Sequence, residues 1–305
     1  MQNGTAFVLA GGGSFGAVQV GMLRELVRVG IVPDLVVGSS VGAINGAYFA
    51  GAPTAEGVVR LEAIWRGLRR SEVFPITWRS FVGLFSHRNF IVDPGGLRHL
   101  IEERLPYREL EQAKIPLHVV ATNLLGGESV RLSSGPAAEA ILASCAIPAA
   151  FPPVRIGERH LIDGAVASNT PISVAVELGV KRVIVLPTGY ACSLKAPPRD
   201  AIASALHAIT LLIAHQLVMD LERCRGQVEI ITVPPLCPLS WSPYDFSHAG
   251  EMIEQAAAQT HRWLERGGLD KQRIPGALLP HSHAGEGEAC EDPETDHAHH
   301  APAGG

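Results

Sequence analysis

The sequence has no excess of basic residues, and this absence excludes one large class of function. Its 25 lysines and arginines are outnumbered by 30 aspartates and glutamates, which gives a net charge of −5. Proteins that bind nucleic acid carry clustered positive charge, so we expect no nucleic-acid partner. The same balance means that any contact with an anionic membrane would depend on apolar residues.

Cysteine is also scarce, and its distribution shows no pattern. The five cysteines are odd in number, widely spaced and without a CxxC pair: Cys145, Cys192, Cys224, Cys237 and Cys290. Such spacing argues against a disulfide framework or a zinc site and fits a reducing compartment. We expect no metal and no cofactor.

The sequence shows neither a signal peptide nor a membrane span. Residues 1–5 contain no cationic start, and the apolar run that follows is interrupted by glycines. The longest apolar segment, residues 201–221, is broken by polar side chains: His207, His215, Gln216 and Asp220. We therefore expect a cytoplasmic protein, with peripheral membrane contact as an open alternative. The pattern carries no signal for an oligomeric state.

Hydrophobic residues make up 47 % of the 305 positions, enough for one large core. Strand and helix patterns alternate along most of the chain, which predicts a single α/β domain over residues 1–280. Short apolar runs predict strands over 6–10, 35–37, 115–121, 130–132, 160–162, 182–186 and 229–233. Helices are predicted over 15–29, 41–49, 137–144, from 171 onward, over 201–221 and over 248–266.

Two segments depart from this alternation. Residues 70–94 combine glycine and proline with aromatic residues, and we interpret them as an irregular insertion or lid: Phe74, Trp78, Phe81, Phe85 and Phe90. Residues 281–305 are rich in histidine, glycine, proline and acidic residues, which predicts a disordered tail. Weak metal binding by the tail histidines is the less favoured alternative.

The strongest local signal is the segment Gly38-Ser39-Ser40-Val41-Gly42, between an apolar strand and a helix of small residues. A sharp strand-to-helix turn needs glycine on both sides, here Gly38 and Gly42, because a Cβ would clash there. Such a turn exposes the central hydroxyl at the positive end of the helix dipole. Ser40 is therefore the candidate nucleophile.

A glycine-rich loop follows the first predicted strand. Its backbone N–H groups can point at one anionic oxygen, so beside a nucleophile we expect an oxyanion hole formed by Gly11, Gly12, Gly13 and Ser14. Gly11, Gly13 and Gly16 also fit the dinucleotide motif GxGxxG. That interpretation requires an acid at the far end of the second strand, where the serine turn stands instead.

The third element is Asp163, which follows a short predicted strand in Asp163-Gly164-Ala165. Parallel strands bring their carboxyl ends to one edge of a sheet, so this carboxylate is expected near Ser40. An ordinary Asp-Gly turn is the alternative for this motif taken alone.

These motifs together resemble the patatin-like phospholipase family over about residues 5–235. Their order and spacing agree with the family, as do three further segments: 143–148, 151–153 and 169–171. The resemblance implies a three-layer α/β/α fold with a central, mostly parallel sheet. It also implies a Ser40–Asp163 dyad without a catalytic histidine, acting on lipids or other hydrophobic carboxylic esters. Phe15 stands where the family often has a cation, which favours neutral or simple esters over phospholipids.

Two rival functions remain open. The first is an α/β-hydrolase in which Ser40 and an aspartate act with a downstream histidine: His207, His215, His248 or His261. The second is a non-catalytic lipid-binding or regulatory protein that keeps the same fold.

Overall fold

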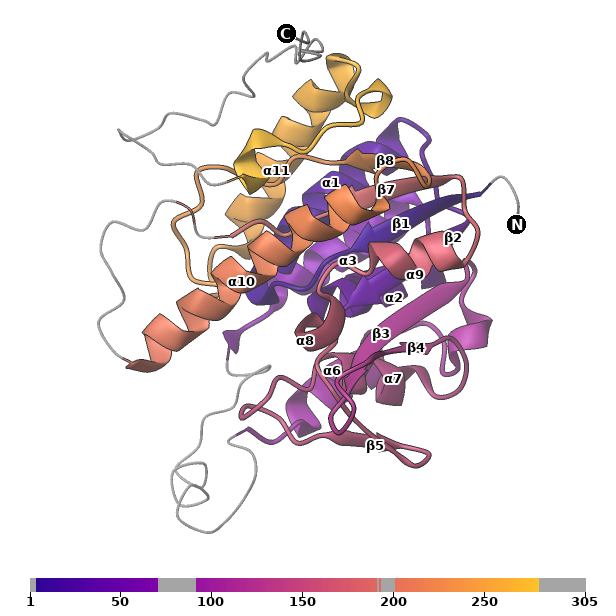
Figure 1. The fold of residues 1–305 in the computed structure, drawn as a ribbon, viewed down its shortest axis with the longest axis vertical. Helices are drawn as coiled ribbons and strands as arrows, with labels where there is room; N and C mark the ends of the chain where they lie inside the picture. The colour runs from indigo at the N-terminus through magenta and orange to yellow at the C-terminus, as the bar shows by residue number, and fades with distance from the viewer. Residues whose placement is uncertain (1–3, 71–91, 191, 193–200, 280–305) are drawn as a thin grey trace, which may run out of the picture.

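The computed structural model describes residues 4–70, 92–190, 192 and 201–279, and within them eight strands form one central sheet (Figure 1). Nearly all of the expected insertion and the whole expected tail lie outside the described residues. The sheet order is β5-β6-β3-β2-β1-β7-β8, and β4 pairs with β3 off this path. The strands are β1 (Thr5–Leu9), β2 (Leu35–Ser39), β3 (Leu117–Asn123), β4 (Ser129–Leu132), β5 (Val154–Ile156), β6 (Arg159–Ile162), β7 (Arg182–Leu186) and β8 (Glu229–Thr232).

The five strands β3, β2, β1, β7 and β8 run parallel. At one side, β4 and β6 each pair antiparallel with β3, and β5 pairs antiparallel with β6. Parallel strands covered on both faces need continuous apolar runs, and all five residues of β2 are buried. In β1, Phe7 and Leu9 join the core on one face, while Ala6 and Val8 join the core on the other. The expected three-layer α/β/α fold is confirmed.

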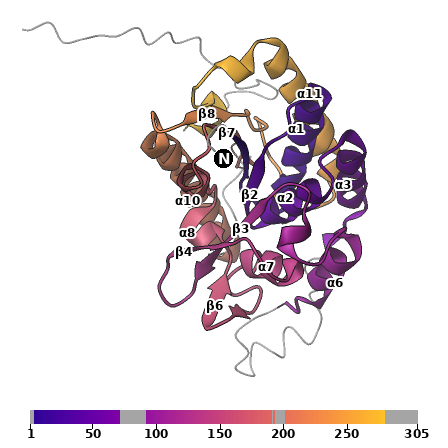
Figure 2. The same ribbon diagram turned by 90° about the vertical axis from the view of Figure 1, so that its right-hand side faces the viewer.

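Helices form a layer on each side of the sheet, as Figure 2 shows. The core of the first face includes residues from α1 (Gly16–Arg28), α2 (Val41–Gly51), α3 (Ala55–Gly67), α6 (Gly95–Arg104), α7 (Ala137–Ser144) and α11 (Ala249–Glu265). The core of the second face includes residues from α9 (Ile172–Glu177) and α10 (Ala201–Cys224), and the short helix α8 (Ala165–Ser168) precedes α9. The 3₁₀ turns are η1 (Gly13–Phe15), η2 (Leu110–Gln112), η3 (Gly268–Asp270) and η4 (Gly276–Leu278).

Several apolar side chains of α10 are exposed, although the sequence of this helix suggests that they would be buried. Near its C-terminal end Leu217 and Leu221 are buried, whereas Ile209 and Leu212 are 49 % and 68 % exposed. Among the α10 side chains that the structure describes, the fully buried ones therefore lie near the C-terminal end of the helix. Among the described helices, none is apolar enough over sufficient length to cross a bilayer.

Candidate active site

The turn between β2 and α2 holds Ser40 in a strained conformation. Its backbone φ of 53° and ψ of −126° lie in a region that residues with a Cβ rarely adopt. A Cβ on Gly38 would lie 2.4 Å from the carbonyl oxygen of Gly42, and one on Gly42 would lie 2.2 Å from the carbonyl oxygen of Leu9. The two glycines thus permit the backbone to fold tightly around Ser40.

Ser144, at the end of α7, supports this turn from outside it. The backbone N–H of Ser40 donates to Ser144 Oγ at 2.8 Å, and that hydroxyl donates to the carbonyl of Val120 at 2.5 Å. Ser144 therefore connects the turn to α7 and to β3. Its segment contributes to the resemblance described above, but the sequence did not indicate this anchoring role.

The side chains of Ser40 and Asp163 meet although they are far apart in the chain. Ser40 Oγ donates to Asp163 Oδ2 at 2.7 Å, and the N–H of Ala165 donates to Asp163 Oδ1 at 2.8 Å. Asp163 is 3 % exposed and Ser40 is 8 % exposed. Both carboxylate oxygens therefore have a hydrogen-bond donor, and one of these donors is the serine hydroxyl.

Asp163 reaches this position by a different route from the one expected. It follows β6, which is antiparallel to β3 and pairs with it only at Ile162–Thr122 and Leu161–Asn123. The expectation of a parallel strand was wrong. Because β6 approaches from beyond the carboxyl end of β3 and overlaps it by two residues, its own end still comes to the edge of the sheet where Ser40 lies.

Burial changes the acidity of this carboxyl group. Removal from water raises the pKa of Asp163 from 3.8 to about 6, against the opposing effect of the hydrogen bonds from Ala165 and Ser40. A carboxylate with this pKa is a stronger base than an exposed aspartate, yet it is still mostly ionised at neutral pH. Those are the properties that proton abstraction from a hydroxyl requires.

Some backbone N–H groups of the glycine-rich loop donate to carbonyls of the protein, and others do not. The N–H of Gly11 donates to the carbonyl of Asn169 at 3.0 Å, and that of Ser14 donates to the carbonyl of Pro243 at 2.7 Å. Within the described parts of the chain, no backbone carbonyl accepts from Gly12 or Gly13. Of the four residues expected to form an oxyanion hole, only these two therefore have backbone donors to offer a ligand.

Close packing explains the glycines at these two positions. A Cβ on Gly12 would lie 2.2 Å from Thr188 Oγ1, and one on Gly13, whose φ is +59°, would lie 2.3 Å from the carbonyl oxygen of Pro243. The hydroxyl of Thr188 also donates to the carbonyl of Gly11 at 2.8 Å. The loop is thus held by Asn169, Thr188 and Pro243, and the sequence did not indicate their contribution.

The downstream histidines do not join this pair. In the described residues, no histidine hydrogen-bonds to Ser40 or Asp163. His248 stacks on Trp241 with ring centroids 4.9 Å apart, and His261 Nδ1 lies 3.2 Å from a carboxylate oxygen of Glu25. His207 and His215 lie on α10, half-buried and exposed respectively. The geometry therefore does not favour a Ser-His-Asp triad.

An apolar cavity of about 70 Å³ opens beside Ser40. Its walls come from the glycine loop, the serine turn, the helices α2, α3 and α6, the segment after α7 and the segment before α11: Gly13, Ser40, Val41, Ile44, Tyr48, Leu61, Ile64, Trp65, Leu68, Leu97, Leu100, Cys145, Ile147, Phe151 and Phe246. None of these side chains is charged. A group that enters the cavity from Ser40 therefore meets hydrocarbon and aromatic surface.

A strained serine turn, a buried carboxylate and a glycine loop at one edge of a mixed sheet place the chain in the class of α/β proteins that present a serine at the carboxyl edge of the sheet. The comparison with known families is specific within that class. The family model described as "Patatin-like phospholipase" matches residues 7–176, more than half of the chain. The chain belongs to the patatin-like phospholipase family.

Curated relatives agree with this membership. The chain is 30 % identical over 193 residues to the patatin-like phospholipase domain-containing protein ZK370.4 of Caenorhabditis elegans, covering 61 % of this chain and 14 % of the relative. It is 29 % identical over 210 residues to an uncharacterized NTE family protein of Mycobacterium bovis, covering 64 % and 51 %. The chain thus spans about half or less of these relatives.

Two solved structures resemble the chain at low identity. Human GIVD cytosolic phospholipase A2 has a TM-score of 0.45 at 12 % identity, with 89 % of this chain and 60 % of that chain covered. VipD from Legionella pneumophila has a TM-score of 0.45 at 15 % identity, with 88 % and 67 % covered.

Proposed function

We propose that this protein hydrolyses carboxylic esters of lipids or other hydrophobic alcohols and acids, with Ser40 as nucleophile and Asp163 as its base. The observation that carries this proposal is the 2.7 Å hydrogen bond from Ser40 Oγ to Asp163 Oδ2. It lies at the opening of an apolar cavity that is suited to an acyl chain. Membership of the patatin-like phospholipase family supports lipid acyl hydrolysis as the type of reaction.

The mechanism has two steps. In the first, Asp163 takes the proton of Ser40 while Oγ bonds to the ester carbonyl carbon. The resulting oxyanion accepts hydrogen bonds from the N–H groups of Gly12 and Gly13. The carbon–oxygen bond to the alcohol then breaks, and the alcohol leaves with the proton held by Asp163.

The second step regenerates the enzyme. A water molecule gives its proton to Asp163 while its oxygen attacks the acyl-serine carbonyl, and the same N–H groups stabilise the new oxyanion. The bond to Ser40 Oγ breaks, Oγ recovers the proton from Asp163, and the carboxylic acid leaves. The dyad thus returns to its initial state without a cofactor.

Neutral or simple esters are the proposed substrates rather than phospholipids. Phe15 occupies the loop position at which the family often has a cation, and its side chain is buried in the core. This position therefore supplies no positive charge to bind a phosphate group. The neutral lining of the cavity beside Ser40 also favours an uncharged acyl chain.

A non-catalytic lipid-binding protein on the same fold is the second candidate. Two features favour catalysis instead: the strained backbone of Ser40 and the raised pKa of Asp163. Strained serines and buried carboxyl groups concentrate at reactive sites, because a purely structural role would not offset their cost.

Ester hydrolysis by matched serine variants tests the proposal. Wild-type protein should hydrolyse p-nitrophenyl octanoate faster than it releases fatty acid from phosphatidylcholine vesicles, and Ser40→Ala should reduce turnover at least ~1,000-fold. Ser39→Ala is the control, because Ser39 Oγ is buried without a hydrogen-bond partner among the described residues. It should retain activity. Unchanged turnover in Ser40→Ala would refute the proposed role of this serine.

A further inference from the structure

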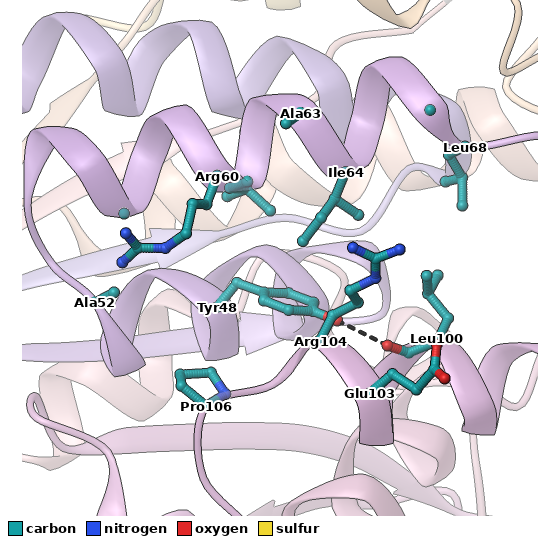
Figure 3. A pocket seen from close by; sticks show the side chains of 13 residues that line it. Tyr48, Ala52, Arg60, Ala63, Ile64, Leu68, Leu100, Glu103, Arg104 and Pro106 are labelled. Atoms are coloured by element: carbon teal, nitrogen blue, oxygen red, sulfur yellow. Dashed lines mark hydrogen bonds between the residues drawn. The ribbon is translucent and has the colours of Figure 1, made fainter.

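A second cavity adjoins the one beside Ser40. It has a volume of about 400 Å³ and lies between α2, α3 and α6 (Figure 3). Five residues line both cavities: Tyr48, Leu61, Ile64, Leu68 and Leu100. We interpret these five shared side chains as a wall between the smaller cavity beside Ser40, called the inner cavity, and the larger one, called the outer cavity.

The wall contains both a fixed side chain and adjustable ones. Tyr48 is buried, and its hydroxyl donates to the carbonyl of Leu100 at 3.1 Å, a bond drawn in Figure 3. Ile64 points from α3 toward Tyr48 in the same view. Ile64 and Leu100 are only half-buried, so their side chains can be shortened with less loss of packing than a core residue.

One face of α2 leads from the nucleophile to this wall. Ser40, Ile44 and Tyr48 are spaced four residues apart and all line the inner cavity. Eight residues of α-helix advance about 12 Å. An extended alkyl chain advances about 1.3 Å per carbon for C–C bonds of about 1.5 Å, so about nine carbons reach from Ser40 to Tyr48.

The chemical character of the lining changes beyond the wall. The inner cavity has no charged residue in its lining, whereas Arg60, Glu103 and Arg104 are among the residues that line the outer cavity (Figure 3). An alkyl chain that ends at the wall stays in apolar surroundings. A longer chain has to displace the wall before it reaches the outer cavity.

We propose that this wall sets the acyl-chain length that the protein accepts: an octanoyl chain attached at Ser40 is short enough to end at the wall, whereas a palmitoyl chain is too long to end before it. The outer cavity is then a latent site for the distal part of a long acyl chain. This inference rests on the proposed ester hydrolysis at Ser40, and it assigns the specificity of that reaction to Ile64, Leu100 and Tyr48.

Chain-length profiles of wall variants test this inference. Wild-type kcat/KM should be at least ~10-fold higher for p-nitrophenyl octanoate than for p-nitrophenyl palmitate. Ile64→Ala and Leu100→Ala should each lower this ratio at least ~10-fold by raising the palmitate rate, because they connect the two cavities. Ile64→Phe thickens the wall and should raise the ratio.

Val58→Ala is the matched control. Val58 is a buried aliphatic residue on the same helix as Ile64, but it lines neither cavity. It should leave the octanoate-to-palmitate ratio unchanged. A ratio that stays constant in active Ile64→Ala and Leu100→Ala proteins would overturn the role of the wall and leave ester hydrolysis intact. Absence of any esterase activity in the wild type would instead refute the proposed function.

Discussion

Ser144 holds the backbone of Ser40 rather than its side chain. The hydroxyl of Ser144 accepts the Ser40 N–H at 2.8 Å, so a residue 104 positions later in the chain restrains the serine turn. This leaves the hydroxyl of Ser40 available for Asp163. Restraint of the backbone and activation of the side chain are therefore supplied by different residues.

Ser144→Ala should weaken both stability and turnover. The substitution removes the acceptor of a buried N–H group, which costs about 2 kcal/mol of unfolding free energy. Movement of the turn should lower kcat roughly tenfold to a hundredfold. Urea unfolding and ester kinetics measure the two effects, with Ser39→Ala as the control for loss of a buried hydroxyl. If Ser144→Ala were as active and stable as the control, the serine turn would keep its conformation without the Ser144 hydroxyl.

The kcat/KM of the enzyme should fall at acidic pH, over a range set by the pKa of Asp163. The base must be ionised, and its pKa is about 6, so kcat/KM should fall about tenfold per pH unit below that value. A pH–rate profile with an uncharged ester measures this fall. A profile that stays flat down to pH 4 would contradict a base with a pKa of about 6.

Asp163 should also make the folded state less stable at neutral pH. Its pKa is raised from 3.8 to about 6, so the folded state binds the proton more tightly than the unfolded state. The favourable contribution is complete below pH 4 and is lost as the pH rises through 6. By linkage the loss amounts to about 3 kcal/mol.

Asp163→Asn removes this pH dependence. The variant should therefore be more stable than the wild type at pH 8 by up to about 3 kcal/mol, and the difference should shrink toward pH 4. Urea denaturation at the two pH values measures it. An equal stability difference at both would contradict the raised pKa.

Two glycines provide a comparison of packing. Gly42→Ala places a Cβ 2.2 Å from the carbonyl oxygen of Leu9, so we expect a loss of at least about 3 kcal/mol and an inactive protein. Gly67→Ala adds its Cβ where no atom lies within 4 Å, so its stability should change by less than about 1 kcal/mol. Thermal unfolding of both variants tests whether close packing requires glycine in the turn.

The sequence predicted the helices and strands whose apolar residues follow a simple pattern. Continuous apolar runs identified β1, β2, β3 and β7, because strands covered on both faces need such runs. The helices α3 and α6 and the short strand β5 were not predicted. The strand β5 lies at the edge of the sheet and none of its three residues is buried, so its sequence lacks the apolar signal of the central strands.

The sequence predicted only part of the candidate site, for a related reason. Ser40 and the glycine loop lie in motifs whose backbone geometry requires particular residues. The antiparallel approach of Asp163 and the support from Ser144 and Pro243 depend on contacts between distant parts of the chain. Such contacts leave no local pattern, so tertiary structure was needed to find them.

Labelling by a fluorophosphonate ester tests the central claim most directly, because this reagent reacts with an activated serine and leaves a stable adduct. Mass spectrometry of the wild type at pH 8 should place the adduct on Ser40, and folded Asp163→Asn should label at least ~100-fold more slowly. Equal labelling rates in the two proteins, or an adduct on another residue, would contradict activation of Ser40 by Asp163.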